Sequence, residues 1–135
     1  MNRDFQKKQE LIAIDQFRQS FPEFPKGKLV PSESPDFILK ATTKKWIGIE
    51  LTSVGNPGQN GSLNSQIIEI VNFKNQKYRS YNSKHIAQHW LIITIDFFNA
   101  DQLVAPEALS ELKDSFFQKI YFFELFNNKI SCLKK

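Results

Sequence analysis

The sequence has few of the features that mark secreted, disulfide-rich and membrane-spanning proteins. Its single cysteine, Cys132, cannot form a disulfide within the chain and falls far short of a structural zinc site. No apolar run approaches the roughly 18 residues that a membrane-spanning helix needs. The opening residues, MNRDFQKKQE, lack the apolar segment of a secretion signal. We therefore expect a cytoplasmic protein with no membrane partner.

The composition is typical of a globular domain. Hydrophobic residues make up 41% and charged residues 24% of the 135 residues, which is enough to bury one core. We expect residues 1–135 to form a single domain. The formal net charge of +4 is compatible with a polyanionic partner, although many basic proteins bind none.

Hydrophobic periodicity and turn residues predict alternating helices and strands. A continuous apolar strand at residues 90–95 follows a long helix, which implies a parallel crossover. We therefore expect an α/β fold with a mixed sheet and helices on both sides. The first helix carries an apolar stripe at Leu11, Ile14, Phe17 and Phe21. In chain order, the predicted elements are helix 4–20, strands 28–31, 35–39 and 46–52, helix 62–81, strand 90–95, helix 106–116 and hairpin strands 119–125 and 129–133.

The strand over residues 46–52 alternates between two faces. One face is apolar and consists of Ile47, Ile49 and Leu51. Glu50 and Thr52 point to the opposite face, because successive side chains of a strand alternate. Gly48 precedes them on that face and is expected to leave open space beside Glu50.

A second carboxylate is expected next to Glu50. If Leu39 pairs with Ile47 across the hairpin, Asp36 lies opposite Glu50, and cross-strand neighbours have Cβ atoms about 5 Å apart. Two carboxylates that close repel each other unless a cation lies between them. The hairpin therefore predicts a pocket suited to a hard divalent ion. In the alternative interpretation, Asp36 belongs to a turn after Pro35 and Glu50 is an ordinary solvated residue.

Three more charged residues fall on apolar helix faces. Glu10 lies in line with Ile14 and Phe17, where a carboxylate is costly unless it is paired. Lys74 lies within the apolar face of helix 62–81, and Lys77 flanks that face. The alternatives are that Glu10 lies at the solvated edge of its stripe and that both lysines extend their ammonium groups to solvent.

Together these residues resemble the motif of a known enzyme superfamily. Glu10, the Pro35-Asp36 pair and the tetrapeptide 49–52 (IELT) are similar to the PD-(D/E)XK nucleases, also called restriction-endonuclease-like. The predicted order of elements over residues 4–95 resembles the core of that fold, with the last helix and hairpin as additions. The usual lysine two residues after the glutamate is replaced by Thr52. Some members carry this lysine on the following helix, where Lys74, which we favour, or Lys77 would take its role.

The resemblance implies a metal-dependent nuclease that hydrolyses phosphodiester bonds of nucleic acid, DNA in the first place. The implied cofactor is Mg²⁺ or Mn²⁺. Its implied ligands are Asp36, Glu50, the backbone carbonyl of Leu51 and Glu10. The implied catalytic groups are Asp36, Glu50, Glu10 and one of Lys74 and Lys77. Thr52 at the rim of the pocket and the loop residues Lys40, Lys44 and Lys45 are the implied substrate contacts.

Two other hypotheses stay open from the sequence. Thr52 favours a catalytically inactive member of the same fold that binds nucleic acid or another protein. An unrelated α/β interaction domain would instead expose both Asp36 and Glu50. Because the chain has no room for a separate recognition domain, we expect a second copy of the chain or a partner subunit to supply sequence specificity.

Overall fold

The computed structural model describes residues 3–33, 35–54, 63–78, 86–95, 110 and 112–134. The described chain forms an α/β structure around one mixed sheet whose six strands follow the order of the sequence. The strands are β1 (Lys28–Pro31), β2 (Phe37–Lys40), β3 (Trp46–Ser53), β4 (Ile86–Ile95), β5 (Lys119–Glu124) and β6 (Lys129–Lys134). Strands β1, β2 and β3 form an antiparallel meander, β3, β4 and β5 are parallel, and β6 is antiparallel to β5.

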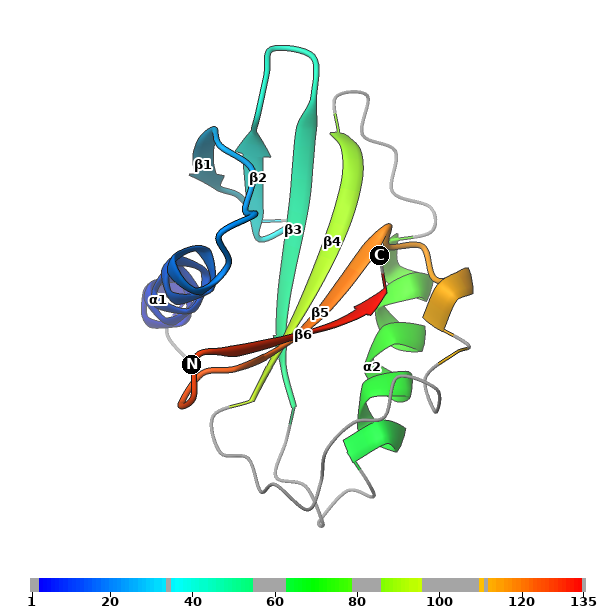
Figure 1. Cartoon of the computed structure of the whole chain (residues 1–135). Helices are drawn as coiled ribbons and strands as arrows, with labels where there is room; N and C mark the ends of the chain where they lie inside the picture. Colours follow the sequence, from blue (N-terminus) through cyan, green and yellow to red (C-terminus); the bar gives the residue numbers. More distant parts are fainter. Residues whose placement is uncertain are drawn as a thin grey trace.

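In the part of the chain that the structure describes, one α-helix covers each face of the sheet (Figure 1). Helix α1 (Arg3–Ser20) packs Ile14 and Phe17 onto the face formed by the odd-numbered residues of β2 and β3. Helix α2 (Leu63–Tyr78) packs onto the other face, against β4 and β5. The predicted mixed sheet with helices on both sides is therefore confirmed. Among the described helices, none is long and apolar enough to cross a membrane.

The residues of α1 that face the sheet differ from the predicted apolar stripe at one position. Leu11 is 42% exposed, so its assignment to the stripe is wrong. With 3.6 residues per turn, the position one turn before the buried Ile14 is taken by Glu10, and Lys7 lies a further turn back. Only the second half of this helix therefore contributes to the core. Its first half presents charged side chains to the end of the sheet.

The element boundaries shift where local patterns are weak. Strand β2 begins at Phe37 and not at residue 35, whereas β4 begins at Ile86, four residues before the apolar run. The early part of β4 is only half-buried, so the continuous apolar pattern that predicts a buried strand starts later. Residues 62, 79–81, 106–109 and 111 of the two later predicted helices lie outside the described residues. Residue 110 and residues 112–114 are in 3₁₀ conformation and residues 115–116 form a bend, so the expected helical end at residue 116 is wrong.

Candidate functional site

The predicted register of the β2–β3 hairpin is confirmed. Leu39 pairs with Ile47, and Phe37 pairs with Ile49 at the start of β2. Asp36 directly precedes β2 and therefore reaches the side chain of Glu50 on the neighbouring strand. The Asp36 Oδ2 atom accepts a hydrogen bond of 2.8 Å from the amide of Leu51. β3 continues past the position opposite Phe37, where β2 begins. The Asp36 side chain therefore takes the place of a backbone partner for Leu51.

Glu50 is buried, with 3% of its surface exposed, on the α2 face of the sheet. Its Oε2 atom accepts a hydrogen bond of 2.8 Å from Lys74 Nζ, and its Oε1 atom accepts one of 2.7 Å from the Tyr78 hydroxyl. The hypothesis of an interaction domain that exposes both carboxylates is therefore wrong for Glu50. Two neighbouring positions of α2, one helical turn apart, fix both carboxylate oxygens of Glu50.

The structure separates the two candidate lysines. The side chain of Lys74 is 15% exposed and forms an ion pair with Glu50, as its position on the inward face predicts. Lys77 is exposed, and its ammonium lies 5.3 Å from the centre of the Tyr78 ring. Tyr78 is a residue of the site that the sequence analysis did not identify. Its spacing of four residues from Lys74 is the sequence signal for its contact with the same carboxylate.

The surroundings of Asp36 disfavour the charged form of its carboxyl group. Burial, the negative charge of Glu50 and a smaller contribution from Glu10 raise the pKa of Asp36 from 3.8 to about 7, and a hydrogen bond with Glu50 acts in the same direction. The amide of Leu51 opposes this rise. Near neutral pH the folded protein therefore holds this carboxyl close to the midpoint between its neutral and charged forms.

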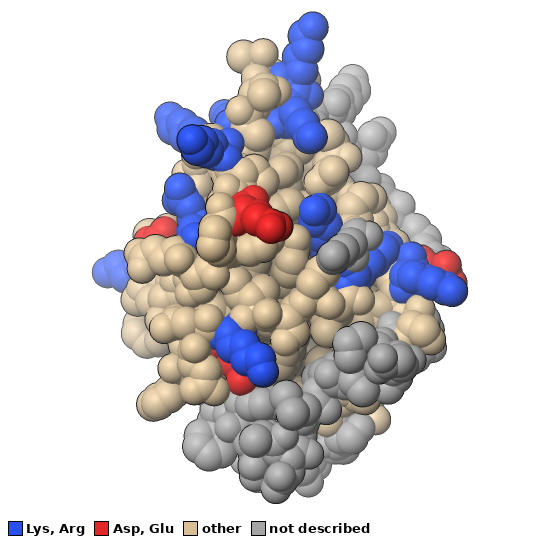
Figure 2. Space-filling model, in the orientation of Figure 1, with Lys and Arg blue, Asp and Glu red and all other residues tan. Residues whose placement is uncertain are grey.

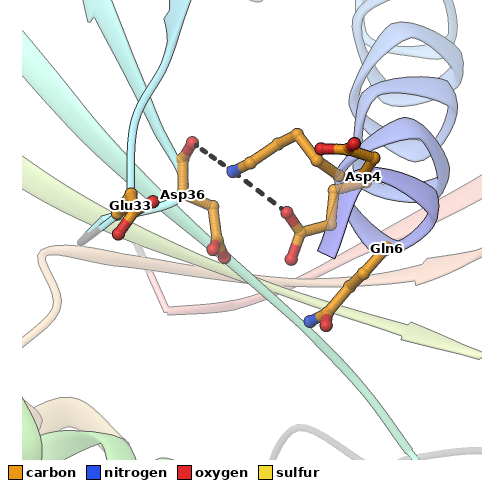
Figure 3. A pocket seen from close by; sticks show the side chains of 6 residues that line it. Asp4, Gln6, Glu33 and Asp36 are labelled. Carbon is orange, nitrogen blue, oxygen red and sulfur yellow. Dashed lines mark hydrogen bonds and ion pairs between the residues drawn. The ribbon is translucent and has the colours of Figure 1, made fainter. Parts of the chain in front are cut away.

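Lys7 is a residue of the site that sequence reasoning missed. Its ammonium forms an ion pair of 3.1 Å with Glu10 Oε1 and donates to the backbone carbonyls of Ser32 (2.7 Å) and Asp36 (3.2 Å), as Figure 3 shows for Asp36. The ammonium also lies 4.9 Å from the centre of the Phe37 ring. A signal was present, because Lys7 lies one turn before Glu10 and two turns before Ile14 on the side of α1 that faces the sheet.

Three adjoining pockets form a groove across this end of the sheet. The first has a volume of about 460 Å³, and the Asp36 carboxylate borders it in Figure 3. The second, of about 330 Å³, shares Gln6 and Glu10 with the first. The third, of about 680 Å³, shares Lys74 with the second, along with Thr52 and Ser53. The first pocket is lined by Asp4, Gln6, Lys7, Glu10, Glu33 and Asp36, and the third adds Gln66, Glu69, Ile70 and Phe73.

The groove brings most of the predicted site residues together. Asp36, Glu10 and Lys74 line it, and the buried Glu50 forms an ion pair with Lys74. Leu51 and the half-buried Thr52 line its central pocket, as expected for a ligand residue and a rim residue. Their roles in binding stay predictions.

The expected open space at Gly48 is wrong. A Cβ atom at this position would lie 2.9 Å from Pro35 Cγ and 3.2 Å from His89 Nδ1. The proline ring and the imidazole therefore occupy the space that the missing side chain leaves. Because Pro35 directly precedes Asp36, this close packing helps to set the place from which Asp36 reaches β3.

The loop lysines lie at the other end of the hairpin. Lys40 pairs with Trp46, and its ammonium lies 4.6 Å from the centre of the Trp46 ring. Lys44 and Lys45 are exposed in the loop, and Figure 2 shows basic side chains at the tip of the hairpin. Glu50 follows Trp46 by four residues in β3, which corresponds to about 13 Å at the usual rise of a strand. These lysines therefore lie away from the pair of carboxyls at Asp36 and Glu50.

The side chains alone do not build a complete metal cage. Within the described part of the chain, no three His, Cys, Asp or Glu side chains gather in a geometry that would hold a metal ion. Asp36 and Glu50 adjoin each other, whereas Glu10 is paired with Lys7. Comparisons with known proteins add no family assignment, because no family model, no curated protein and no solved structure matches this chain.

Proposed function

We propose that the protein is a metal-dependent nuclease of the PD-(D/E)XK type that hydrolyses phosphodiester bonds of DNA, with Lys74 in place of the usual motif lysine. The observation that carries the proposal is the interaction of Glu50 with both Asp36 and Lys74, which line two adjoining pockets of the groove. The three come from separate elements and lie up to 38 positions apart in the chain. A structural salt bridge explains Glu50 and Lys74, but it does not explain a second carboxyl placed beside them.

The order of elements supports the same proposal. Helix α1 precedes the meander β1–β3, and α2 then crosses over to β4, which is parallel to β3. This is the order that the resemblance implies for residues 4–95. Asp36 lies directly before β2 and Glu50 lies within β3, where the implied motif requires the two carboxylates.

The donor set suits a hard divalent ion bound largely by water and substrate. Mg²⁺ typically uses one or two protein carboxylates and completes its octahedron with water and phosphate oxygens. Asp36 and Glu50 supply two carboxylates, and burial together with the negative charge of Glu50 raises the pKa of Asp36 to about 7, so a cation bound here would stabilise its charged form. The amide of Leu51 points toward Asp36. Its carbonyl therefore faces the same edge, because the amide and carbonyl of one strand residue share a direction.

A bound Mg²⁺ or Mn²⁺ would polarise the scissile phosphate and lower the pKa of a nearby water molecule. The chain's own groups would position the substrate. Lys74 lines the groove beside Glu50, so its ammonium is placed to orient water or to stabilise negative charge that develops on the phosphate. The Tyr78 hydroxyl is a positioning group, because it holds Glu50 and does not reach the groove as a lining residue.

The substrate is expected to follow the groove and reach the hairpin tip. Thr52 would donate a hydrogen bond at the rim, and the exposed Lys44 and Lys45 would contact phosphates away from the scissile bond. Glu10, which lines the groove, would hold a water molecule at the edge of the site.

The test is Mg²⁺-dependent cleavage of single-stranded and duplex DNA by matched variants. We expect Asp36→Asn, Glu50→Gln and Lys74→Ala each to lower the cleavage rate by about a hundredfold or more. Lys77→Ala is the control for Lys74→Ala, because it removes the same side chain one turn away on the same helix, and it should keep the rate within about twofold. Circular dichroism would verify that each variant is folded.

Two results would contradict the proposal. One is a folded wild-type protein that cleaves neither DNA form with Mg²⁺ or Mn²⁺. The other is wild-type activity that survives both Asp36→Asn and Glu50→Gln.

One observation favours the second candidate, a catalytically inactive member of the fold that binds nucleic acid. The Lys74 ammonium at 2.8 Å already offsets the charge of Glu50, which lowers the attraction of this carboxylate for a metal ion. Calorimetric titration with Mn²⁺ separates the two candidates. Binding of DNA without any binding of Mn²⁺ would favour the inactive form.

A further inference from the structure

Lys7 takes up an unusual place for a helix lysine. It does not extend away from the surface but bends toward the loop before β2, where it contacts two backbone carbonyls and one carboxylate. Its side chain is 35% exposed, and that of Glu10 is 17% exposed. The ion pair is therefore half-enclosed in the first pocket and is screened less than a surface pair.

The surroundings of Lys7 are acidic. Asp4, Glu10, Glu33 and Asp36 line the same pocket, and Lys7 is the one cation among the described residues that line it. An ammonium with three oxygen partners within 3.2 Å occupies a position resembling that of a bound cation, whose ligands in proteins are carboxylate and carbonyl oxygens. The ammonium contacts both the carbonyl of Asp36, at 3.2 Å, and the carboxylate of Glu10, at 3.1 Å, and so connects the two groups.

We propose that Lys7 is a built-in cation that replaces a second metal ion, so that the candidate site binds one divalent ion and not two. This inference rests on the proposed function. Nucleases with two ions place them about 3.5–4 Å apart and need carboxylates on both sides. Here Glu10 is the carboxylate available for a second ion, and Lys7 already neutralises it. The positive charge of Lys7 also repels any further cation that enters the first pocket.

The test counts ions bound to the metal-free protein and needs no substrate. Mn²⁺ is titrated by isothermal calorimetry, and free Mn²⁺ is followed in parallel by electron paramagnetic resonance. We expect the wild type to bind one Mn²⁺ per chain and Lys7→Met to bind two, because the methionine keeps the length of the side chain but removes its charge. Lys7→Arg keeps the charge and should bind one. Lys7→Gln, which is neutral but retains an amide donor for the Ser32 carbonyl, is the substitute if the methionine variant does not fold.

A double variant separates the charge of Lys7 from its role as a tether. In Lys7→Met combined with Glu10→Gln, the carboxylate that would hold the second ion is gone, so binding should return to one Mn²⁺ per chain. A purely structural role for Lys7 would lower thermal stability in both variants without any change in the number of ions.

The outcomes distinguish this inference from the proposed function. A folded wild type that binds no Mn²⁺ contradicts both. A wild type that binds two ions, or a folded neutral variant of Lys7 that still binds one, overturns the role of Lys7 and leaves the nuclease proposal standing.

Discussion

Glu50 and Asp36 lie next to each other on adjacent segments, but the protein treats their charges in opposite ways. Glu50 is enclosed by α2, and Lys74 and Tyr78 bind both of its oxygens. Asp36 borders an open pocket, receives one amide and faces the negative charges of Glu50 and Glu10. The negative charge of Glu50 is therefore offset within the fold by the Lys74 ammonium. The charge of Asp36 would be offset by a bound cation.

This difference bears directly on function. A carboxylate held by two partners has its position set before any ligand arrives, which is the property of a preorganised site. A carboxylate whose charged form is disfavoured by burial and by a neighbouring negative charge gains the most from a cation, because the cation stabilises that charged form. We regard Glu50 as the fixed half of the candidate site and Asp36 as the responsive half.

The largest expected effect concerns the fixed half. Glu50→Ala leaves Lys74 and the Tyr78 hydroxyl without their carboxylate, and loss of one partner of a buried ion pair typically costs about 3–5 kcal/mol. We expect the free energy of unfolding in urea to fall by that amount. Asp36→Ala without divalent ions should cost much less, because it removes like-charge repulsion and a buried carboxyl together with the hydrogen bonds to Leu51 and Glu50. Equal losses in the two variants would mean that the two carboxylates do not differ.

Gly48→Ala should disturb the contact between Asp36 and Glu50. The new methyl group would meet the rigid ring of Pro35 at 2.9 Å, so the segment that carries Asp36 must move. Overpacking of this kind costs about 1–3 kcal/mol. We expect a lower melting temperature and weaker binding of Mn²⁺, measured by calorimetry. Ser53→Ala, at an exposed position of the same strand, is the control, and a similar change in both variants would contradict the role of Gly48.

The responsive half should give the metal-free protein a distinctive pH dependence. The pKa of Asp36 is about 7 in the folded protein and near 3.8 in an unfolded chain, so the folded state binds the proton more tightly between these values. The contribution of Asp36 to stability therefore falls as pH rises from about 4 to 7 and levels off above 7.

Thermal melts of the wild type and Asp36→Asn at pH 5 and pH 8 measure this contribution. The wild type should lose more stability between the two pH values than the variant does, and saturating Mg²⁺ at pH 8 should reverse the loss. Parallel curves for the two proteins would show that the environment of Asp36 does not favour its neutral form.

The smallest expected effect concerns the third pocket, at the end of the groove away from Asp36. Phe73 is 65% exposed and lines the third pocket beside Lys74. Exposed aromatic rings next to a phosphate site can stack on unpaired bases. We expect Phe73→Ala to weaken binding of single-stranded DNA by about fivefold, which corresponds to about 1 kcal/mol. Fluorescence anisotropy measures this change, and Phe126→Ala, which removes an exposed ring outside the groove, should leave affinity unchanged.

Several features of the protein follow from the sequence by itself. The register that brings Asp36 next to Glu50 was predictable, because a strand alternates with a period of two and the apolar faces of β2 and β3 must match. The inward position of Lys74 was predictable for a similar reason, since helical periodicity places it among residues that pack on the sheet. Both results depend on short-range patterns that the chain carries before it folds.

Only the tertiary structure decided which groups meet across the site. Glu50 meets Lys74 and Tyr78, and Lys7 binds the loop before β2. These contacts join residues that lie 24 to 29 positions apart in the chain. The filling of the space at Gly48 by Pro35 is of the same kind. Local periodicity indicates which face a side chain occupies, but the packing of α1 and α2 on opposite faces of the sheet determines which partner it finds there.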